Sequence, residues 1–214
     1  MKTVAFVPIK MNNQRLPGKN ILPIGNKPMC WYIINTLLQI KNIDSTYVYC
    51  SDKEICKYIP EKAIFLKRSK WLDGNLVKGF HIYDSFIKQI DADIYILAHA
   101  TSPFTKKETI EDALNHVINN QNDSSFSAER KQTFVWYDGK PINYDLNNVP
   151  RTQDLTPVFV ETSGFFIFKK EIFTKYHRRI GFKPYIKEVN GIEAIDIDEK
   201  QDYELAVNLY QTTL

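Results

Sequence analysis

The chain has 214 residues, of which 43% are hydrophobic and 25% charged, so it can bury one substantial core and disorder is not expected. The chain has 28 Lys and Arg residues and 25 Asp and Glu residues. The resulting net charge of +3 is too small to favour a nucleic-acid partner. The longest N-terminal apolar run, residues 4–9, is too short for a signal sequence or a membrane span, so a single cytoplasmic domain without a membrane partner is expected.

Strand-like and helix-like segments alternate along the first half of the chain. Residues 4–7, 46–50 and 94–98 are apolar, β-branched or aromatic runs of strand length, typical of strands buried on both faces of a parallel sheet. Apolar residues at helical spacing follow each run, in segments 29–40, 73–90 and 108–119. This alternation predicts right-handed crossovers and an open α/β sheet.

The three cysteines, Cys30, Cys50 and Cys56, are odd in number and lack paired C-x-x-C spacing. They are therefore predicted to be buried thiols of a reduced compartment. Neither a disulfide framework nor a zinc site is expected.

The region from about 130 to 160 departs from the alternation. Residues 133–137 and 140–144 flank Asp138-Gly139, a pair typical of a two-residue hairpin turn, and a strand pattern resumes at 158–168. This inserted segment is predicted to be a lid, an arm that grips another subunit, or an ordinary solvent-facing hairpin. Beyond it, residues 194–198 are predicted to form a strand and residues 199–211 a helix.

Three polar segments follow predicted strands, at the positions where open α/β sheets bind ligands. The first, residues 10–20, contains Lys10, Arg15 and Lys19 together with a Pro-Gly turn. Backbone N–H groups with Lys and Arg beside them can cradle a polyphosphate, although a solvated basic loop is the alternative. The glycine patterns of Walker A and dinucleotide-binding loops are absent from this sequence.

The second segment, residues 98–103, combines small residues with the hydroxyls of Thr101 and Ser102, which could hold a ligand. A capped turn into the next helix explains the same residues almost as well. His99 could also contact a ligand, but a lone histidine after a buried strand is more often satisfied by the fold.

The third segment contains Asp196 and Asp198. On a strand these two carboxylates would point the same way, while Ile197 points into the core. Hard oxygen ligands shared with a phosphate substrate are the usual way in which proteins hold Mg²⁺, and solvated edge aspartates are the alternative. Together with the basic loop, the pair suits metal-assisted nucleotidyl transfer.

Five short motifs, in this order, make the chain resemble the acylneuraminate cytidylyltransferase family, which activates acidic sugars for bacterial surface polysaccharides. The motifs are Leu16-Pro17-x-Lys19-Asn20, Ser51-Asp52, Thr101-Ser102-Pro103, Arg151-x-Gln153 followed by Gly164, and Ile195-Asp196-Ile197-Asp198. The resemblance implies transfer of CMP from CTP to a sugar hydroxyl with loss of pyrophosphate. It also implies a Rossmann-like, mostly parallel sheet with helices on both faces, and a homodimer held by a protruding β-hairpin arm at 130–160.

The resemblance also implies roles for individual residues. Lys19 and Asp198 would be catalytic, and Asp196 and Asp198 would hold Mg²⁺. The nucleotide would contact Pro8, Lys10, Asn12, Lys19, Asn20 and, near the cytosine and ribose, Asp52. The acceptor would contact Thr101, Ser102, Arg151, Gln153 and Glu161. No convincing general base is found; coordination of the attacking hydroxyl by the metal could lower its pKa.

Several positions depart from the family pattern. Lys10 stands where the family usually has Arg, Asn13-Gln14-Arg15 replaces Ser-Lys-Gly, and Phe104-Thr105 replaces Leu-Arg. Glu161 lies where sialic acid enzymes can place Arg, so it would repel an acceptor carboxylate unless it is itself paired. The adjacent Arg178 and Arg179 could supply the missing cations, although a solvated basic turn is the simpler interpretation.

These departures leave the acceptor open. Sialic acid, another nonulosonate and an octulosonate are all compatible with the sequence. A phosphonate or polyol phosphate is an alternative acceptor, and a nucleotide-binding protein without turnover is an alternative function.

Overall fold

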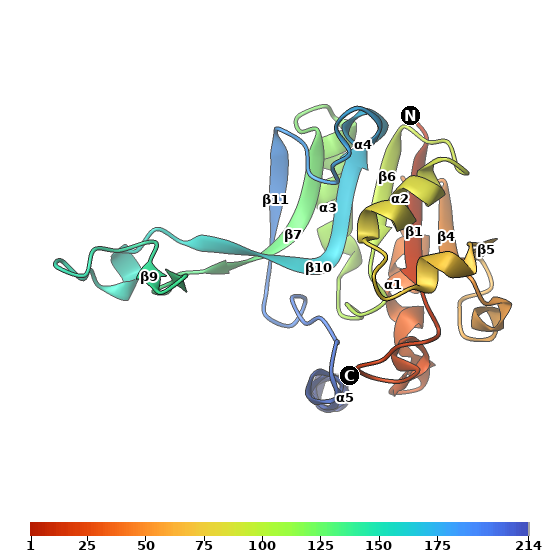
Figure 1. Cartoon of the computed structure of the whole chain (residues 1–214), viewed down its shortest axis with the longest axis horizontal. Coiled ribbons are helices and arrows are strands. Elements are labelled where there is room, and N and C mark those ends of the chain that lie inside the picture. Colours follow the sequence, from red (N-terminus) through yellow and green to blue (C-terminus); the bar gives the residue numbers. More distant parts are fainter. Residues whose placement is uncertain (214) are drawn as a thin grey trace.

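Continuous apolar runs form the centre of a seven-stranded sheet in the computed structural model, which describes residues 1–213 (Figure 1). The strand order is β11-β7-β10-β6-β1-β4-β5, and β10 is antiparallel to both of its neighbours while the other pairs are parallel. An open, mostly parallel α/β sheet is thus confirmed. The strands are β1 (Thr3–Ile9), β4 (Ser45–Cys50), β5 (Ile64–Lys67), β6 (Ile94–Ala98), β7 (Ser124–Lys131), β10 (Val158–Lys169) and β11 (Pro184–Val189).

Helices cover both faces of this sheet because successive residues of a buried strand point in opposite directions. Ala5 and Val7 of β1 pack in the same cluster as α1 and α3, whereas Val4 and Phe6 pack with α2 on the other face. Among residues 1–213, no helix has the length and apolarity needed to cross a bilayer. The helices are α1 (Met29–Leu38), α2 (Gly79–Ile87), α3 (Lys107–Ile118), α4 (Lys170–Tyr176) and α5 (Lys200–Thr213).

One predicted helix is shorter than expected, and one predicted strand is absent. The helix expected at 73–90 begins only at Gly79, since Asp73 closes a short 3-10 turn and Leu76 is 97% exposed. Residues 194–198 form no strand: the amide of Ile197 donates to the carbonyl of Thr101 in a loop, not to a neighbouring strand. The side chain of Ile197 is nevertheless buried in the core, as predicted.

The cysteine prediction is only partly confirmed. Cys30 and Cys50 are buried free thiols, whereas Cys56 is exposed on a 3-10 turn that follows β4. Burial raises the pKa of the Cys30 thiol to about 12, so this thiol is unreactive at neutral pH.

The segment at 130–160 leaves the sheet as a long protrusion (Figure 1). The far halves of β7 and β10 pair along its stem, and the register breaks between Glu161 and Phe166, where β10 joins the body. In its outer part, β8 (Trp136–Tyr137) and β9 (Lys140–Pro141) form the predicted hairpin (Figure 1). Asp138 and Gly139 both adopt positive φ, 48° and 72°, as a two-residue hairpin turn requires.

Phe86 of α2 is central to one face of the core and provides a test of it. Its buried ring stacks on Phe6 at 4.2 Å and meets the edges of Tyr47 and Tyr49. Truncation to alanine should lower the free energy of unfolding by about 3–5 kcal/mol in urea titrations. Leu76→Ala, at a 97% exposed site, is the matched control and should change it by less than about 0.5 kcal/mol. Equal effects of the two variants would contradict this description of the core.

Candidate functional site

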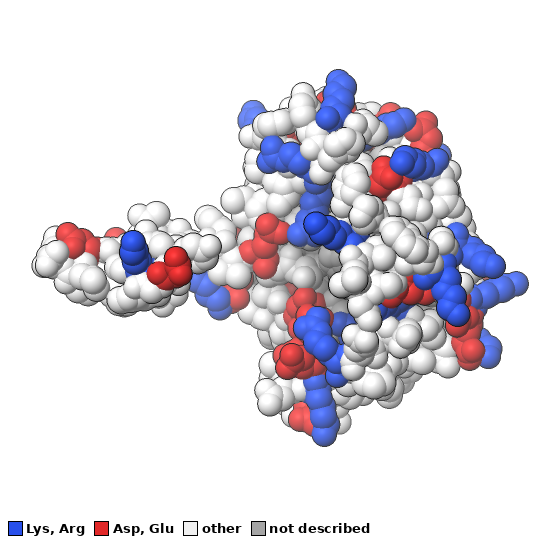
Figure 2. Space-filling view, in the orientation of Figure 1, with Lys and Arg blue, Asp and Glu red and all other residues white. Residues whose placement is uncertain are grey.

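A cavity of about 470 Å³ opens at the carboxyl ends of β1 and β6. Its size lies within the range of small-molecule sites, and its position is where open α/β sheets bind ligands. Figure 2 shows a hollow in the body of the protein that is bordered by both basic and acidic side chains. Charged residues lining the cavity include Lys10, Arg15, Lys19, Arg68 and Asp198.

The first predicted loop is shaped by a turn that aims Lys19 across the cavity. Gly18 adopts a positive φ of 67°, and the amide of Lys19 donates to the carbonyl of Leu16 at 3.1 Å. A Pro-Gly pair suits this geometry because proline presets the first turn residue and glycine tolerates the second. The Lys19 ammonium then donates to Oδ1 of Asp198 at 2.7 Å and to the Ile197 carbonyl at 3.1 Å.

Asp198 is therefore held by two cations from the N-terminal loop. Arg15 donates to its Oδ2 at 2.7 Å while Lys19, only 12% exposed, holds Oδ1. Partial burial opposes ionisation of this carboxyl, but the bonds to Lys19 and Arg15 outweigh burial and hold its pKa below the usual range. The structure thus brings the two predicted catalytic residues, Lys19 and Asp198, into direct contact.

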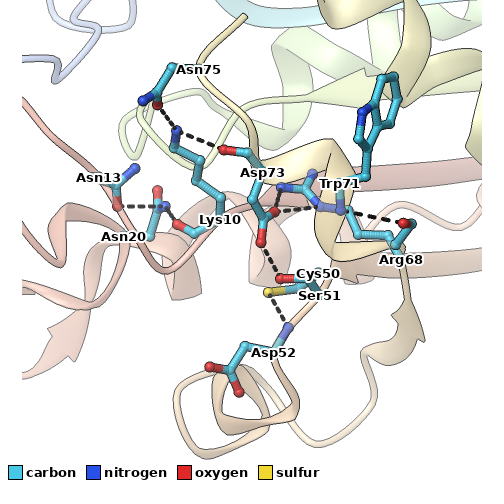
Figure 3. A network of polar contacts seen from close by, with 11 residues as sticks. Lys10, Asn13, Asn20, Cys50, Ser51, Asp52, Arg68, Trp71, Asp73 and Asn75 are labelled. Carbon is cyan, nitrogen blue, oxygen red and sulfur yellow. Dashed lines mark hydrogen bonds and ion pairs between the residues drawn. The ribbon is translucent and has the colours of Figure 1, made fainter. Parts of the chain in front are cut away.

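Lys10 belongs to a polar network beside the cavity (Figure 3). Its ammonium donates to Oδ1 of Asn75 at 3.0 Å and to the carbonyl of Asp73 at 3.3 Å. The Asp73 carboxylate accepts two bonds from Arg68 and one from the hydroxyl of Ser51. The network ties the ends of β1, β4 and β5 to the segment that precedes α2.

The other predicted nucleotide contacts divide into two groups. Pro8 lines the cavity, and so does Asn20, which is buried and shapes the loop by donating to the carbonyl of Lys10 at 2.9 Å. Asn12 is exposed and lies outside the lining residues. Asp52 is also outside the lining: its carboxylate accepts from the amide of Glu54 and, in Figure 3, points away from the network.

The predicted acceptor residues are dispersed. Thr101 lines the cavity, whereas Ser102 is buried in a turn, 1% exposed, and its carbonyl accepts from Thr105. Arg151 and Gln153 lie on the protruding segment, where Arg151 pairs with Asp154 at 2.7 Å. Neither of these two residues lines the cavity of its own chain.

Glu161 departs from the family pattern in the way least favourable to an acidic ligand, but its carboxylate is paired with Arg179. Arg179 donates from Nη2 to its Oε2 at 3.2 Å and lies over the ring of Phe166 at 3.6 Å. The same guanidinium donates to the hydroxyl of Tyr83, a cavity residue, at 3.4 Å. The Arg179 side chain is therefore a fixed cation next to a cavity residue rather than a freely solvated one.

Asp196 has an unusual environment for a carboxylate. Its Oδ1 is buried without a hydrogen-bond partner among the described residues. An orphaned buried oxygen is rare and commonly marks the place of an ion or a water. Among residues 1–213 no cluster of three or more His, Cys, Asp or Glu could hold a metal, so a cation here would depend on Asp196 and Asp198 together with ligand oxygens.

Part of the cavity wall comes from residues that the sequence patterns did not predict as site residues. Arg68 and Asn75 follow β5, which was not recognised as a strand, so no site was expected at its carboxyl end. The run Ile64–Lys67 is short and ends in a lysine, which weakens its strand signal. Tyr83 was assigned to a helix, correctly, but a helical pattern does not show which side chain reaches a cavity.

Comparison with known proteins identifies the family. The family model described as "Cytidylyltransferase" matches residues 4–214. The chain belongs to the cytidylyltransferase family. This assignment agrees with the geometry, in which a cationic loop and a carboxylate face one cavity.

Curated relatives are distant. The chain is 23% identical to an N-acylneuraminate cytidylyltransferase of Streptococcus agalactiae, covering 95% of this chain and 52% of that protein. It therefore spans about half the length of the N-acylneuraminate relatives that it matches. It is 24% identical to a pseudaminic acid cytidylyltransferase of Campylobacter jejuni, covering 99% of this chain and 97% of that protein.

Solved structures share the fold. A CMP:2-keto-3-deoxy-manno-octonic acid synthetase complexed with CTP aligns over 100% of both chains, with a TM-score of 0.76 and 18% identity. A 4-diphosphocytidyl-2C-methyl-D-erythritol synthase from Anaerococcus prevotii aligns with a TM-score of 0.63 and 13% identity, covering 98% of this chain and 96% of that one. The Rossmann-like architecture is thereby confirmed.

Replacing Lys19 tests the electrostatic description of the site. Lys19→Met removes the nearest cation from Asp198, so the pKa of that carboxyl should rise toward its ordinary value of about 3.9, with Arg15 retaining part of the shift. Carboxyl-carbon NMR titration measures this pKa directly. Lys57→Met, whose ammonium pairs with Glu54 instead, is the control. An Asp198 pKa that is the same in both variants would contradict the assigned ion pair.

Proposed function

We propose that this chain transfers CMP from CTP to a hydroxyl of an acidic sugar, with release of pyrophosphate. The contact between Lys19 and Asp198 carries the proposal, because it brings a cationic loop and a carboxylate to one cavity. Membership of the cytidylyltransferase family supports CTP as the nucleotide. The names of the sialic and pseudaminic acid relatives support a sugar acid as the acceptor. A product that serves surface polysaccharide synthesis is what the motif resemblance implies.

The basic residues of the cavity would bind the triphosphate. Attack of the acceptor hydroxyl on the α-phosphorus moves negative charge onto the leaving pyrophosphate. A cation fixed beside that charge lowers the barrier because it needs no reorganisation during the reaction. Lys19 is the best-placed group, being largely buried and held at the cavity wall, while Lys10 and Arg15 would add charge around the phosphates.

Asp196 and Asp198 would hold Mg²⁺ together with the phosphates of the substrate. The orphaned oxygen of Asp196 and the ionised state of Asp198 suit a hard cation that uses one or two carboxylates. When bound, the ion would neutralise phosphate charge. Lys19 and Arg15, which hold Asp198, would bind phosphate oxygens of the substrate.

The pairing of Glu161 with Arg179 supports an acidic acceptor. An unpaired Glu161 would repel a carboxylate, but Arg179 neutralises it and retains further N–H donors. Because Arg179 is stacked on Phe166 and bonded to Tyr83, its charge is held beside a residue that lines the cavity. Thr101 would lie beside the same acceptor.

The protruding segment would hold two copies of the chain together as a homodimer. Many apolar side chains on it are exposed to solvent, and such surfaces commonly pair with another protein. A second copy would also explain the position of Arg151 and Gln153 on the protruding segment, because there they could reach an acceptor only in the cavity of a partner. The exposed apolar residues are Phe134, Trp136, Tyr137, Ile142, Leu146, Val149, Phe159 and Val160.

The proposed function is tested by pyrophosphate release from CTP and Mg²⁺ with a panel of acceptors. The panel contains sialic acid, pseudaminic acid, a 3-deoxy-octulosonate, a phosphonate and a polyol phosphate. At least one carboxylated sugar should release pyrophosphate and give a CMP-sugar by mass spectrometry. Turnover of only the phosphonate or the polyol phosphate would overturn the acceptor class. Binding of CTP without turnover of any acceptor would overturn the enzymatic function.

Substitution of the two aspartates tests the metal assignment. Asp196→Asn and Asp198→Asn should each lower kcat by about 100-fold or more, with little change in melting temperature, because each removes a charged oxygen ligand without removing packing. Glu204→Gln, at an exposed pair with Lys200, is the control. If both asparagine variants keep most of their activity at saturating Mg²⁺, these residues do not hold the metal.

Deletion of the β8–β9 hairpin tests the proposed dimer. Replacing residues 133–144 by a short Gly-Ser linker removes the hairpin and its exposed aromatic residues, so the variant should sediment as a monomer. Sedimentation velocity of the full chain and the variant at equal concentration measures this. A variant that still sediments as a dimer would refute the role of the arm.

A further inference from the structure

His99 is a partly buried titratable group of the cavity that the proposed function has not used. It follows β6 directly, is largely shielded from solvent, and lines the cavity together with Lys19 and Asp198. Its Nδ1 lies 2.5 Å from the carbonyl oxygen of Ser163. Because a carbonyl oxygen can only accept, Nδ1 must be the protonated nitrogen. Nε2 of the neutral ring is then a free lone pair.

The surroundings of His99 keep the ring neutral. Burial lowers its pKa below the ordinary value, and the positive charges of Arg179 and Lys19 act in the same direction. The bond to Ser163 and the negative charge of Asp196 oppose this shift without reversing it. The ring also packs edge-on against Phe166, which fixes its orientation. At neutral pH His99 is therefore an unprotonated base with a fixed tautomer.

The other titratable groups around the cavity are less suited to accept a proton. Asp198 is occupied by Lys19 and Arg15, and Glu161 is paired with Arg179. The hydroxyl oxygen of Tyr83 already accepts from Arg179. Among the described residues that line the cavity, His99 alone combines a neutral basic nitrogen with no hydrogen-bond partner at that nitrogen.

We propose that Nε2 of His99 is the general base that accepts the proton of the attacking acceptor hydroxyl. This role rests on the proposed cytidylyl transfer. The acceptor O–H bond breaks, its proton passes to Nε2, and the oxygen forms a bond to the α-phosphorus of CTP. The bond from that phosphorus to the bridging oxygen breaks, and pyrophosphate leaves with the electron pair. The imidazolium then returns its proton to water.

His99→Asn separates catalysis from support of the fold. The asparagine amide can still donate to the Ser163 carbonyl, as Nδ1–H does, but it has no nitrogen that can accept a proton. General-base catalysis typically contributes 10²–10⁴-fold, so kcat should fall by about 100-fold or more while the Kd for CTP stays within about threefold. His116→Asn is the matched control, since His116 stacks on Tyr185 outside the cavity and should leave kcat unchanged.

The pH dependence of kcat/KM provides a readout that a purely structural role would not move. In the wild type the rate should fall as pH drops through the pKa of His99, below about 6.5, because the protonated ring cannot act as a base. His99→Asn should lose this decrease of kcat/KM at acidic pH. Any effect on the rate of protonating CTP itself remains in both proteins.

Each outcome of this experiment decides the proposal. Activity of His99→Asn within about threefold of the wild type would overturn it, and so would a slow variant that keeps the same acid limb. In both cases an active wild type would leave the proposed cytidylyl transfer intact. A wild type that turns over no acceptor would instead overturn the cytidylyl transfer, and the role of His99 with it.

Discussion

The ion pair between Lys19 and Asp198 is the constraint on which the rest of the site depends. It joins residues 179 positions apart and closes the cavity between the N-terminal loop and the segment before α5. Lys19 stabilises the charged form of Asp198, so the cavity holds a cation and an anion in defined places. A triphosphate with a divalent cation carries the complementary pair of charges. In the proposed function, the ion pair would act as a template for such a ligand.

The sheet makes this meeting possible. Parallel strands end at one edge, so the loops after β1, β4, β5 and β6 converge there although they are far apart in sequence. Lys10 and Arg68 reach the cavity from two of these loops, and His99 from a third. The antiparallel strand β10 passes the same edge and contributes Ser163, whose carbonyl fixes the tautomer of His99. The proposed cation, metal ligands and base thus come from elements that only the sheet brings together.

Much of the fold could be predicted because its central strands carry continuous apolar runs. Such runs are typical of strands whose two faces are both covered, as in a sheet between two layers of helices, so the sequence constrained the architecture strongly. Strands with weaker patterns were missed. The stretch Ser124–Lys131 of β7 contains three serines, and Pro184–Val189 of β11 contains charged residues, so their pairing is visible only in the assembled sheet. The strand predicted at 194–198 is absent. Its alternating apolar and acidic residues belong to a loop, in which the amide of Ile197 donates to the carbonyl of Thr101.

For the site, the sequence by itself determined the chemical types: a basic loop with a Pro-Gly turn, and a pair of aspartates around a buried isoleucine. Local residue patterns are sufficient for that, because turn geometry and charge are local properties. Only the tertiary structure decided that Arg179 neutralises Glu161 from another loop, and that Arg151, on the predicted arm, lies outside the cavity of its own chain. It also decided which nitrogen of His99 is free. These properties are set by contacts between segments distant in sequence, and no local pattern encodes such contacts.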